Sequence, residues 1–185
     1  MEHSYPALLT LEEWGALSGD AFGQLLDYCF AHSDCFTLTW QGSDCPETPE
    51  WNRRQGEFLA QLAPWLTGRI STSRWFWIRV SPKRPLAVFL YSTAPGAKQV
   101  LADTFHDLFL AAGEDCFWLP EDLCFFSQGR LWLGTSSHEY HASAYPRSRG
   151  EAELLLSLGP WKERGRADRL WTEPLVLADF PPEPQ

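Results

Sequence analysis

The first fifty residues of the sequence contain no lysine and no arginine, although they contain nine aspartates and glutamates. The next fifty carry eight basic residues against one glutamate, and the whole chain of 185 residues has a net charge of −9. Nucleic-acid binding draws its affinity from basic side chains on phosphates, so this charge argues against a general nucleic-acid binder. It favours association with an oppositely charged partner, unless the acidic block packs against the basic block within the fold.

Long apolar runs and targeting signals are also missing. No segment approaches the roughly 18 consecutive apolar residues of a membrane span. The N-terminus lacks the basic region and apolar run of a signal peptide. The five cysteines are odd in number and show no CxxC spacing, which indicates reduced thiols. These absences predict a cytoplasmic protein without contact to a membrane.

Cofactor and metal motifs are absent as well. The sequence has no GxGxxG after a strand and no Walker-type loop, so no nucleotide cofactor is expected. His138 and His141 form HExH and not the HExxH of zinc peptidases. This segment reads as a strand, where the two histidines would point to opposite faces. We therefore expect no metal site.

Apolar periodicity and capping signals predict four to five helices. A capping-box pattern at Thr10–Glu13 predicts a helix to about Ser18, and the apolar spacing after Asp20 predicts a second helix. Thr48-Pro49 starts a third helix that runs to Leu66 and ends at 67–68. The further helices are predicted from Pro95 to Ala112, ending at Gly113, and from the capping box at Ser148–Glu151 to Leu158.

Alternating segments between these helices predict about five to six strands in a mainly antiparallel sheet. The expected strands are 35–40, a hairpin of 74–80 with 86–91, and a meander of 123–127, 130–134 and about 138–144. This order predicts an α+β fold. We expect a single domain over residues 1–158, followed by a loosely packed tail over 159–185 with a short strand at 175–177.

The expected strand 74–80 places Trp75, Trp77 and Arg79 on one face. If helices cover both faces of the sheet, these side chains belong to the core. If one face is open, Trp and Arg are the residue types that dominate binding hot spots. Both interpretations stay open at this level.

The polar turn 135–141 is the densest cluster of candidate chemistry. An enzyme would use Ser137 as nucleophile and His138 as base, with Glu139 and Cys124 nearby. Against this, nucleophile and base usually come from distant parts of a chain, and no GxSxG elbow surrounds the serine. A polar hairpin turn is the simpler interpretation.

The leading hypothesis is a non-catalytic binding protein that acts through an acidic, aromatic-bearing surface, for example a bacterial immunity or antitoxin-type inhibitor of a basic toxin. The alternatives are a small hydrolase or transferase that uses the turn around His138, and a regulatory subunit of a larger complex. The partner would be another protein, and the oligomeric state is left open. The residues expected to bind are Trp14, Asp20, Asp27, Asp34, Asp44, Glu47, Trp75, Trp77 and Arg79.

Overall fold

A computed structural model describes residues 7–40, 49–110 and 119–182. An antiparallel sheet of eight strands, in the order β10-β1-β9-β8-β7-β2-β6-β3, organises this part of the chain. The α+β class and the single domain are confirmed, with more strands than the five to six expected. The strands are β1 (Leu9–Leu11), β2 (Cys35–Trp40), β3 (Leu66–Thr72), β6 (Leu86–Ser92), β7 (Glu121–Ser127), β8 (Arg130–Ser136), β9 (His141–Ala144) and β10 (Lys162–Glu163).

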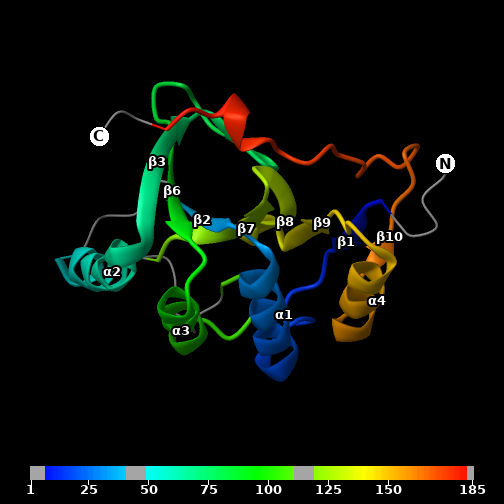
Figure 1. Ribbon diagram of the computed structural model, residues 1–185. Helices are drawn as coiled ribbons and strands as arrows, with labels where there is room; N and C mark the ends of the chain where they lie inside the picture. The colour runs from blue at the N-terminus through cyan, green and yellow to red at the C-terminus, as the bar shows by residue number, and fades with distance from the viewer. Residues whose placement is uncertain (1–6, 41–48, 111–118, 183–185) are drawn as a thin grey trace.

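Three helices cover one face of the sheet (Figure 1). They are α1 (Gly19–His32), α3 (Pro95–Thr104) and α4 (Arg149–Leu158), while α2 (Pro49–Leu62) lies beside β3 at the end of the sheet. The amphipathic stripe predicted for α1 is buried, including Leu25 and Cys29. This face therefore holds the larger apolar core, as the helix periodicity indicates.

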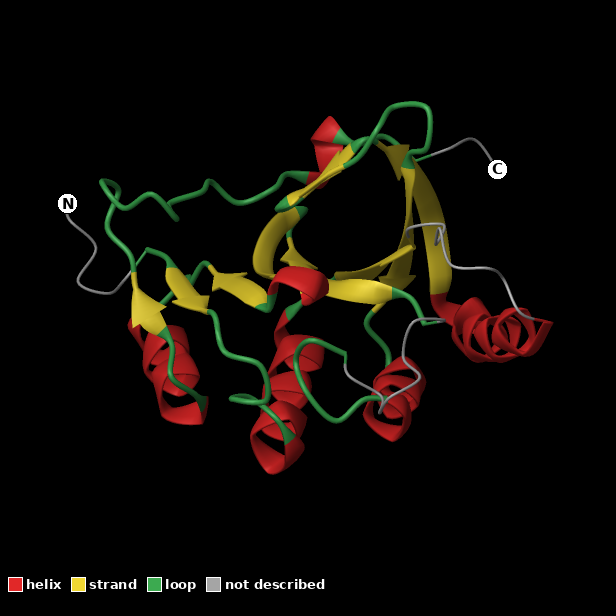
Figure 2. Cartoon of the chain, turned by 180° about the vertical axis from the view of Figure 1, so that it is seen from behind, coloured by secondary structure: helices red, strands yellow, loops and turns green. Residues whose placement is uncertain are grey.

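The opposite face is covered by irregular structure (Figure 2). A two-stranded ribbon of β4 (Arg74–Trp75) and β5 (Ile78–Arg79) packs there with the chain after β10. The fully buried Trp75 ring meets Phe180 edge-on, with ring centroids 5.1 Å apart. The segment 159–182 thus contributes β10, a buried Phe180 and a single bridge between Val176 and Arg130.

The sheet curls strongly between its two ends, so that β3 and β6 stand away from β1 and β9 (Figure 1). The register shifts in the pairing of β2 with β7, of β7 with β8 and of β3 with β6. Such bulges bend a strand and increase its twist. The curl lets the short β4–β5 ribbon and the C-terminal segment cover the second face.

The helix predicted over Thr10–Ser18 is wrong. Leu9–Leu11 instead form β1, which pairs with β9 and β10. Thr10 is buried, and its hydroxyl accepts a hydrogen bond from the Arg164 guanidinium at 2.8 Å, so it caps no helix. The capping-box pattern led to a wrong helix prediction because pairing with distant strands overrides a local signal of four residues.

The single strand predicted over 74–80, with its alternating faces, is also wrong. Phe76 has a φ of 44°, and the chain reverses there to form the β4–β5 ribbon. As a result β6 pairs with β2 and β3, and not with 74–80. The strand β3 was missed because Leu66 continues the apolar spacing of the third predicted helix. In the structure that helix, α2, ends at Leu62, and Leu66 is the first residue of β3.

The helix that starts at Pro95 ends at Thr104, before the predicted end at Ala112. Leu108 and Phe109 are still buried, but from a loop whose backbone bonds to the segment before α1. Gly113 lies outside the described residues. The first two strands of the meander and the last helix agree with prediction, including the cap of α4, where Ser148 Oγ accepts from the N–H of Glu151 at 3.2 Å. The third strand starts at His141 and not at about His138, because Ser137–Glu139 form a short 3-10 turn, so the strand predicted for His138 is wrong.

Candidate functional site

Two exposed aromatic side chains from distant parts of the sequence meet on one surface. The exposed fractions of Trp14 and Tyr140 are 61% and 49%, and their ring centroids lie 6.2 Å apart. The other large apolar side chains exposed among the described residues are Leu66 and Leu156, both aliphatic. Exposed aromatic pairs are the side chains that most often anchor protein–protein contacts.

Backbone conformation holds both rings at the surface. Trp14 lies in the turn between β1 and α1, where Gly15 has a φ of 74° that favours glycine. Tyr140 ends the short 3-10 turn Ser137–Glu139 and has a left-handed φ of 47°. The buried Phe109 ring lies below, 6.0 Å edge-on from Tyr140. The aromatic pair thus rests on the core.

Carboxylates flank each ring. Glu13 precedes Trp14 and Glu139 precedes Tyr140, and both are exposed. In the part of the chain that the structure describes, neither carboxylate makes an ion pair. Glu12 differs, since it pairs with Arg164 at 3.2 Å and lies 3.9 Å from Nδ1 of His141. We call Glu12, Glu13, Trp14, Glu139 and Tyr140 the acidic aromatic surface.

A buried carboxylate supports the turn that carries Tyr140. Asp122, at the start of β7, accepts a hydrogen bond from the N–H of Ser137 at 2.8 Å and another from the Thr39 hydroxyl. In return its own N–H donates to Ser137 Oγ at 3.1 Å. Burial, with a smaller contribution from Glu121, raises the pKa of Asp122 to about 7, although the bonds from Thr39 and Ser137 oppose the shift.

A second contact closes the same turn from the solvent side. Nε2 of His138 lies 3.0 Å from the carboxylate of Glu121. The hydrogen bond to Glu121 raises the pKa of His138, against the smaller effect of burial. The imidazolium therefore gains a partner at near-neutral pH, and the turn is held by two acid groups on adjacent residues of β7.

The structure separates the residues considered for catalysis. The Ser137 hydroxyl is buried and engaged with the N–H of Asp122, whereas His138 faces Glu121. Cys124 is fully buried in the second core, and burial raises its thiol pKa to about 12. Glu139 is exposed beside Tyr140. These side chains form parts of a turn and a core, and the described contacts do not join them into one nucleophile–base pair.

The acidic residues predicted to bind are dispersed. Asp20 is exposed at the start of α1, Asp27 pairs with Lys98 at 2.6 Å, and the Asp34 carboxylate accepts the N–H of Gln128. Asp44 and Glu47 lie outside the described residues.

The predicted aromatic–arginine face does not form. Trp75 is core, and Trp77 is half-buried against the His141 ring at 4.6 Å. Arg79 donates to the carbonyls of Phe76 and Ile78. Of the predicted aromatic binding residues only Trp14 is openly exposed. Its partner Tyr140 was missed, because only the left-handed turn brings that ring outward.

Some contacts between the acidic and basic blocks of the sequence involve described residues. Among the described residues, Asp27 with Lys98 and Glu50 with Arg53 and Arg54 join the two blocks. The carboxylates beside Trp14 and Tyr140 are not part of these pairs. Within the described residues, the basic block therefore makes no ion pair with Glu13 or Glu139.

Across residues 7–40, 49–110 and 119–182, no helix is long and apolar enough to cross a membrane, and no group of three or more candidate ligands is placed to hold a metal ion. Comparisons of the chain with protein-family models, with curated proteins and with solved structures found no match.

Proposed function

We propose that this protein is a cytoplasmic binding protein without catalysis, whose acidic aromatic surface captures a partner protein with a basic face. In its concrete version it is an immunity or antitoxin-type inhibitor of a basic toxin. One observation carries the proposal: the exposed Trp14 and Tyr140 rings lie together, and each follows an exposed glutamate that makes no ion pair among the described residues. A regulatory subunit of a larger complex would use the same surface, with a permanent partner.

The aromatic rings supply the affinity in this proposal. Covering two large rings removes apolar area from water, and Trp and Tyr lose little side-chain entropy when they are bound. Because Phe109 and the turn below hold Tyr140 in place, the surface needs little rearrangement on binding. Truncation of such an anchor costs about 2 kcal/mol or more in binding.

The carboxylates supply the orientation and the association rate. Glu13 and Glu139 flank the rings and attract lysines or arginines on the partner. Screening by salt weakens such steering, since the Debye length falls to roughly 8 Å at physiological ionic strength. A basic partner should therefore associate more slowly as salt increases.

The test starts from the partner retained by the tagged protein from its native cytosol at low salt. That partner is then purified, and its affinity is measured for the wild type, Trp14→Ala, Tyr140→Ala and the double variant. We expect each single variant to weaken binding at least tenfold. Glu13→Gln with Glu139→Gln should mainly lower the association rate and its salt dependence.

Matched controls lie elsewhere on the surface. Leu66→Ala and Leu156→Ala remove exposed apolar side chains outside the acidic aromatic surface, and Glu57→Gln with Glu153→Gln removes two distant carboxylates. None of these should change the affinity by more than about twofold. Full binding by the double variant Trp14→Ala/Tyr140→Ala would overturn the proposal.

A further inference from the structure

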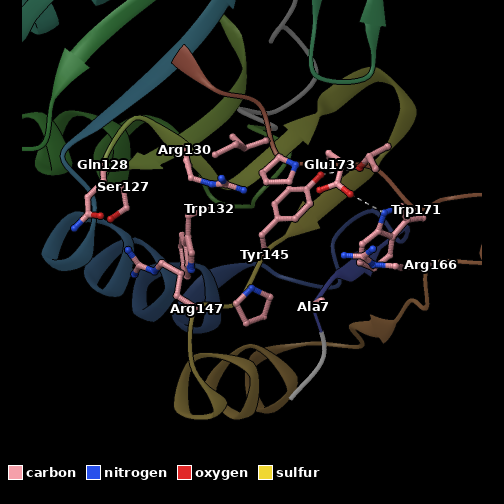
Figure 3. A pocket seen from close by; sticks show the side chains of 14 residues that line it. Ala7, Ser127, Gln128, Arg130, Trp132, Tyr145, Arg147, Arg166, Trp171 and Glu173 are labelled. Carbon is pink, nitrogen blue, oxygen red and sulfur yellow. Dashed lines mark hydrogen bonds between the residues drawn. The ribbon is translucent and has the colours of Figure 1, made fainter. Parts of the chain in front are cut away.

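A cavity of about 580 Å³ opens beyond the far end of β9, away from Tyr140. Its walls come from the β7–β8 turn, from the ends of β8 and β9, and from the chain after β10 (Figure 3). This volume lies within the range of sites that hold small organic molecules. The cavity shares no residue with the acidic aromatic surface.

The cavity is basic in an acidic protein. Three arginines line it, against Glu173 as the one carboxylate among its described lining residues. Arg130 and Tyr145 lie at its centre, Arg147 lies on one side and Arg166 on the other (Figure 3). A concentration of guanidinium groups in a chain of net charge −9 points to an anionic ligand.

The three arginines of the cavity differ in how far other groups of the protein already bind them. Arg147 binds the buried carboxylate of Glu151 and lies 5.5 Å above the Trp132 ring, so its charge is largely compensated. Arg166 lies 5.7 Å above the Trp171 ring. In the described part of the chain, the guanidiniums of Arg130 and Arg166 have no carboxylate partner. These two are the groups available to an incoming anion.

The walls are fixed before any ligand binds. Two backbone hydrogen bonds of 2.8 Å, from Leu131 to Leu175 and from Leu177 to Gly129, hold the C-terminal segment against the β7–β8 hairpin. The Tyr145 hydroxyl meets Thr172 Oγ1 at 2.7 Å across the cavity. A preformed cavity loses little conformational entropy on binding.

Aromatic surfaces complete the site. The half-exposed Trp171 lies at one side of the cavity and donates its Nε1–H to Glu173 at 3.4 Å. On the other side Trp132 is fully buried under Arg147, so the guanidinium covers its ring. Guanidinium groups stacked on indoles present a flat, cationic wall that suits a planar ring carrying an oxyanion.

We propose that this cavity is a binding site for a small organic anion in which a phosphate or carboxylate is attached to a planar ring. Arg130 and Arg166 bind the oxyanion, and Trp171 contacts the ring. Two carboxylates limit the negative charge of a ligand that the site can bind. Glu173 lies at the wall, and the Asp34 carboxylate accepts the N–H of Gln128.

The test is calorimetric titration of the full chain with four probes. Adenosine 5′-monophosphate and indole-3-acetate carry both a ring and an oxyanion, one as phosphate and the other as carboxylate. Adenosine lacks the oxyanion and inorganic phosphate lacks the ring. We expect at least one of the first two to bind at least tenfold more tightly than either of the last two, and the better one identifies the oxyanion.

Variants locate the binding in the cavity. Arg130→Gln and Arg166→Gln should each lower the affinity for the probe that binds by at least tenfold. Arg169→Gln removes one exposed positive charge from the same segment outside the cavity and should leave the affinity unchanged. Thermal unfolding of each variant distinguishes a lost contact from a lost fold. The proposal is overturned if no ring-bearing anion binds at millimolar concentration, or if Arg169→Gln weakens binding as much as the others.

Discussion

Two buried carboxylates, near opposite ends of β9, are held by similar bonds but differ in charge state. In each region a serine hydroxyl accepts the N–H of the acidic residue: Ser137 for Asp122, and Ser148 for Glu151. At both carboxyls burial acts to raise the pKa, and hydrogen bonds act to lower it. At Glu151 the hydrogen bonds from Arg147 outweigh burial, so that its pKa is lowered, whereas at Asp122 burial prevails and the pKa is about 7.

The two ends of the molecule therefore respond differently to their surroundings. Glu151 stays ionised and joins four groups: Arg147, Trp132 Nε1, the Tyr28 hydroxyl and its own cap. Asp122 takes up a proton near neutral pH, directly below the turn that carries Tyr140. One region is an ionic junction, and the other holds a carboxyl whose pKa is raised by burial, next to the turn that carries Tyr140.

The largest effect is expected when the ionic junction is cut. Glu151→Ala removes the carboxylate that the partly buried Arg147 binds and the acceptor of Trp132 Nε1, so the free energy of unfolding should fall by about 3–5 kcal/mol. Urea denaturation measures this loss. Glu153→Ala, which cuts an exposed pair with Arg149 on the same helix, should cost less than about 1 kcal/mol. Equal losses in the two variants would contradict the distinction drawn between the regions.

The next effect concerns the sign of the pH dependence at Asp122. Its pKa is about 7 in the fold and about 3.9 in the unfolded chain. The fold therefore binds more protons between these values, and the stability that this group contributes falls as pH rises from 4 to 7. Between pH 5 and 8 the fall is on the order of 2–3 kcal/mol.

Asp122→Asn removes this titration and keeps the shape of the side chain. Asn also tolerates the left-handed φ of 56° at this position. The variant should therefore lose less stability than the wild type when the pH is raised from 5 to 8. Asp103→Asn changes an exposed carboxylate and should leave the wild-type pH dependence intact. Identical pH profiles for Asp122→Asn and the wild type would show that Asp122 ionises normally in the fold.

Removal of the serine beside each carboxylate should also affect the stability of the fold to different degrees. Ser137→Ala leaves the buried N–H of Asp122 without an acceptor, at a cost of about 1–3 kcal/mol. Ser148→Ala removes a helix cap that water can partly replace, at a cost of about 1 kcal/mol. Thermal unfolding should therefore rank Ser137→Ala as the more damaging substitution. The reverse order would mean that the polar turn is open to water.

The sequence predicts one of these regions and misses the other for a physical reason. The capping box at Ser148–Glu151 lies within four residues, so a local pattern reveals it. The pairing of Asp122 with Ser137 joins the start of β7 to the turn after β8, and it depends on strand register. Nothing in the residues next to Asp122 marks it as buried.

The same distinction applies to the candidate site. Trp14 was predicted to bind, but its contact with Tyr140 depends on the pairing of β1 with β9, which the sequence does not reveal. The strand β1 was itself predicted to be a helix. The cavity was missed entirely, because its arginines and its aromatic walls come from three separated segments. Charge blocks indicated an uneven surface, but only the fold places individual charges.

The smallest effect is expected at the solvent side of the polar turn. His138 pairs with Glu121, but its side chain is 60% exposed, so solvent screens the interaction to less than about 1 kcal/mol. The folded pKa of His138 is raised, so this contribution is fully present below the unfolded pKa of about 6.5 and is lost as pH rises through the folded pKa. His138→Gln should thus cost a few tenths of a kcal/mol at pH 5.5 and nothing at pH 9. A loss that persists at pH 9 would mean that His138 supports the turn by packing, and the response to pH near Tyr140 would then belong to Asp122 alone.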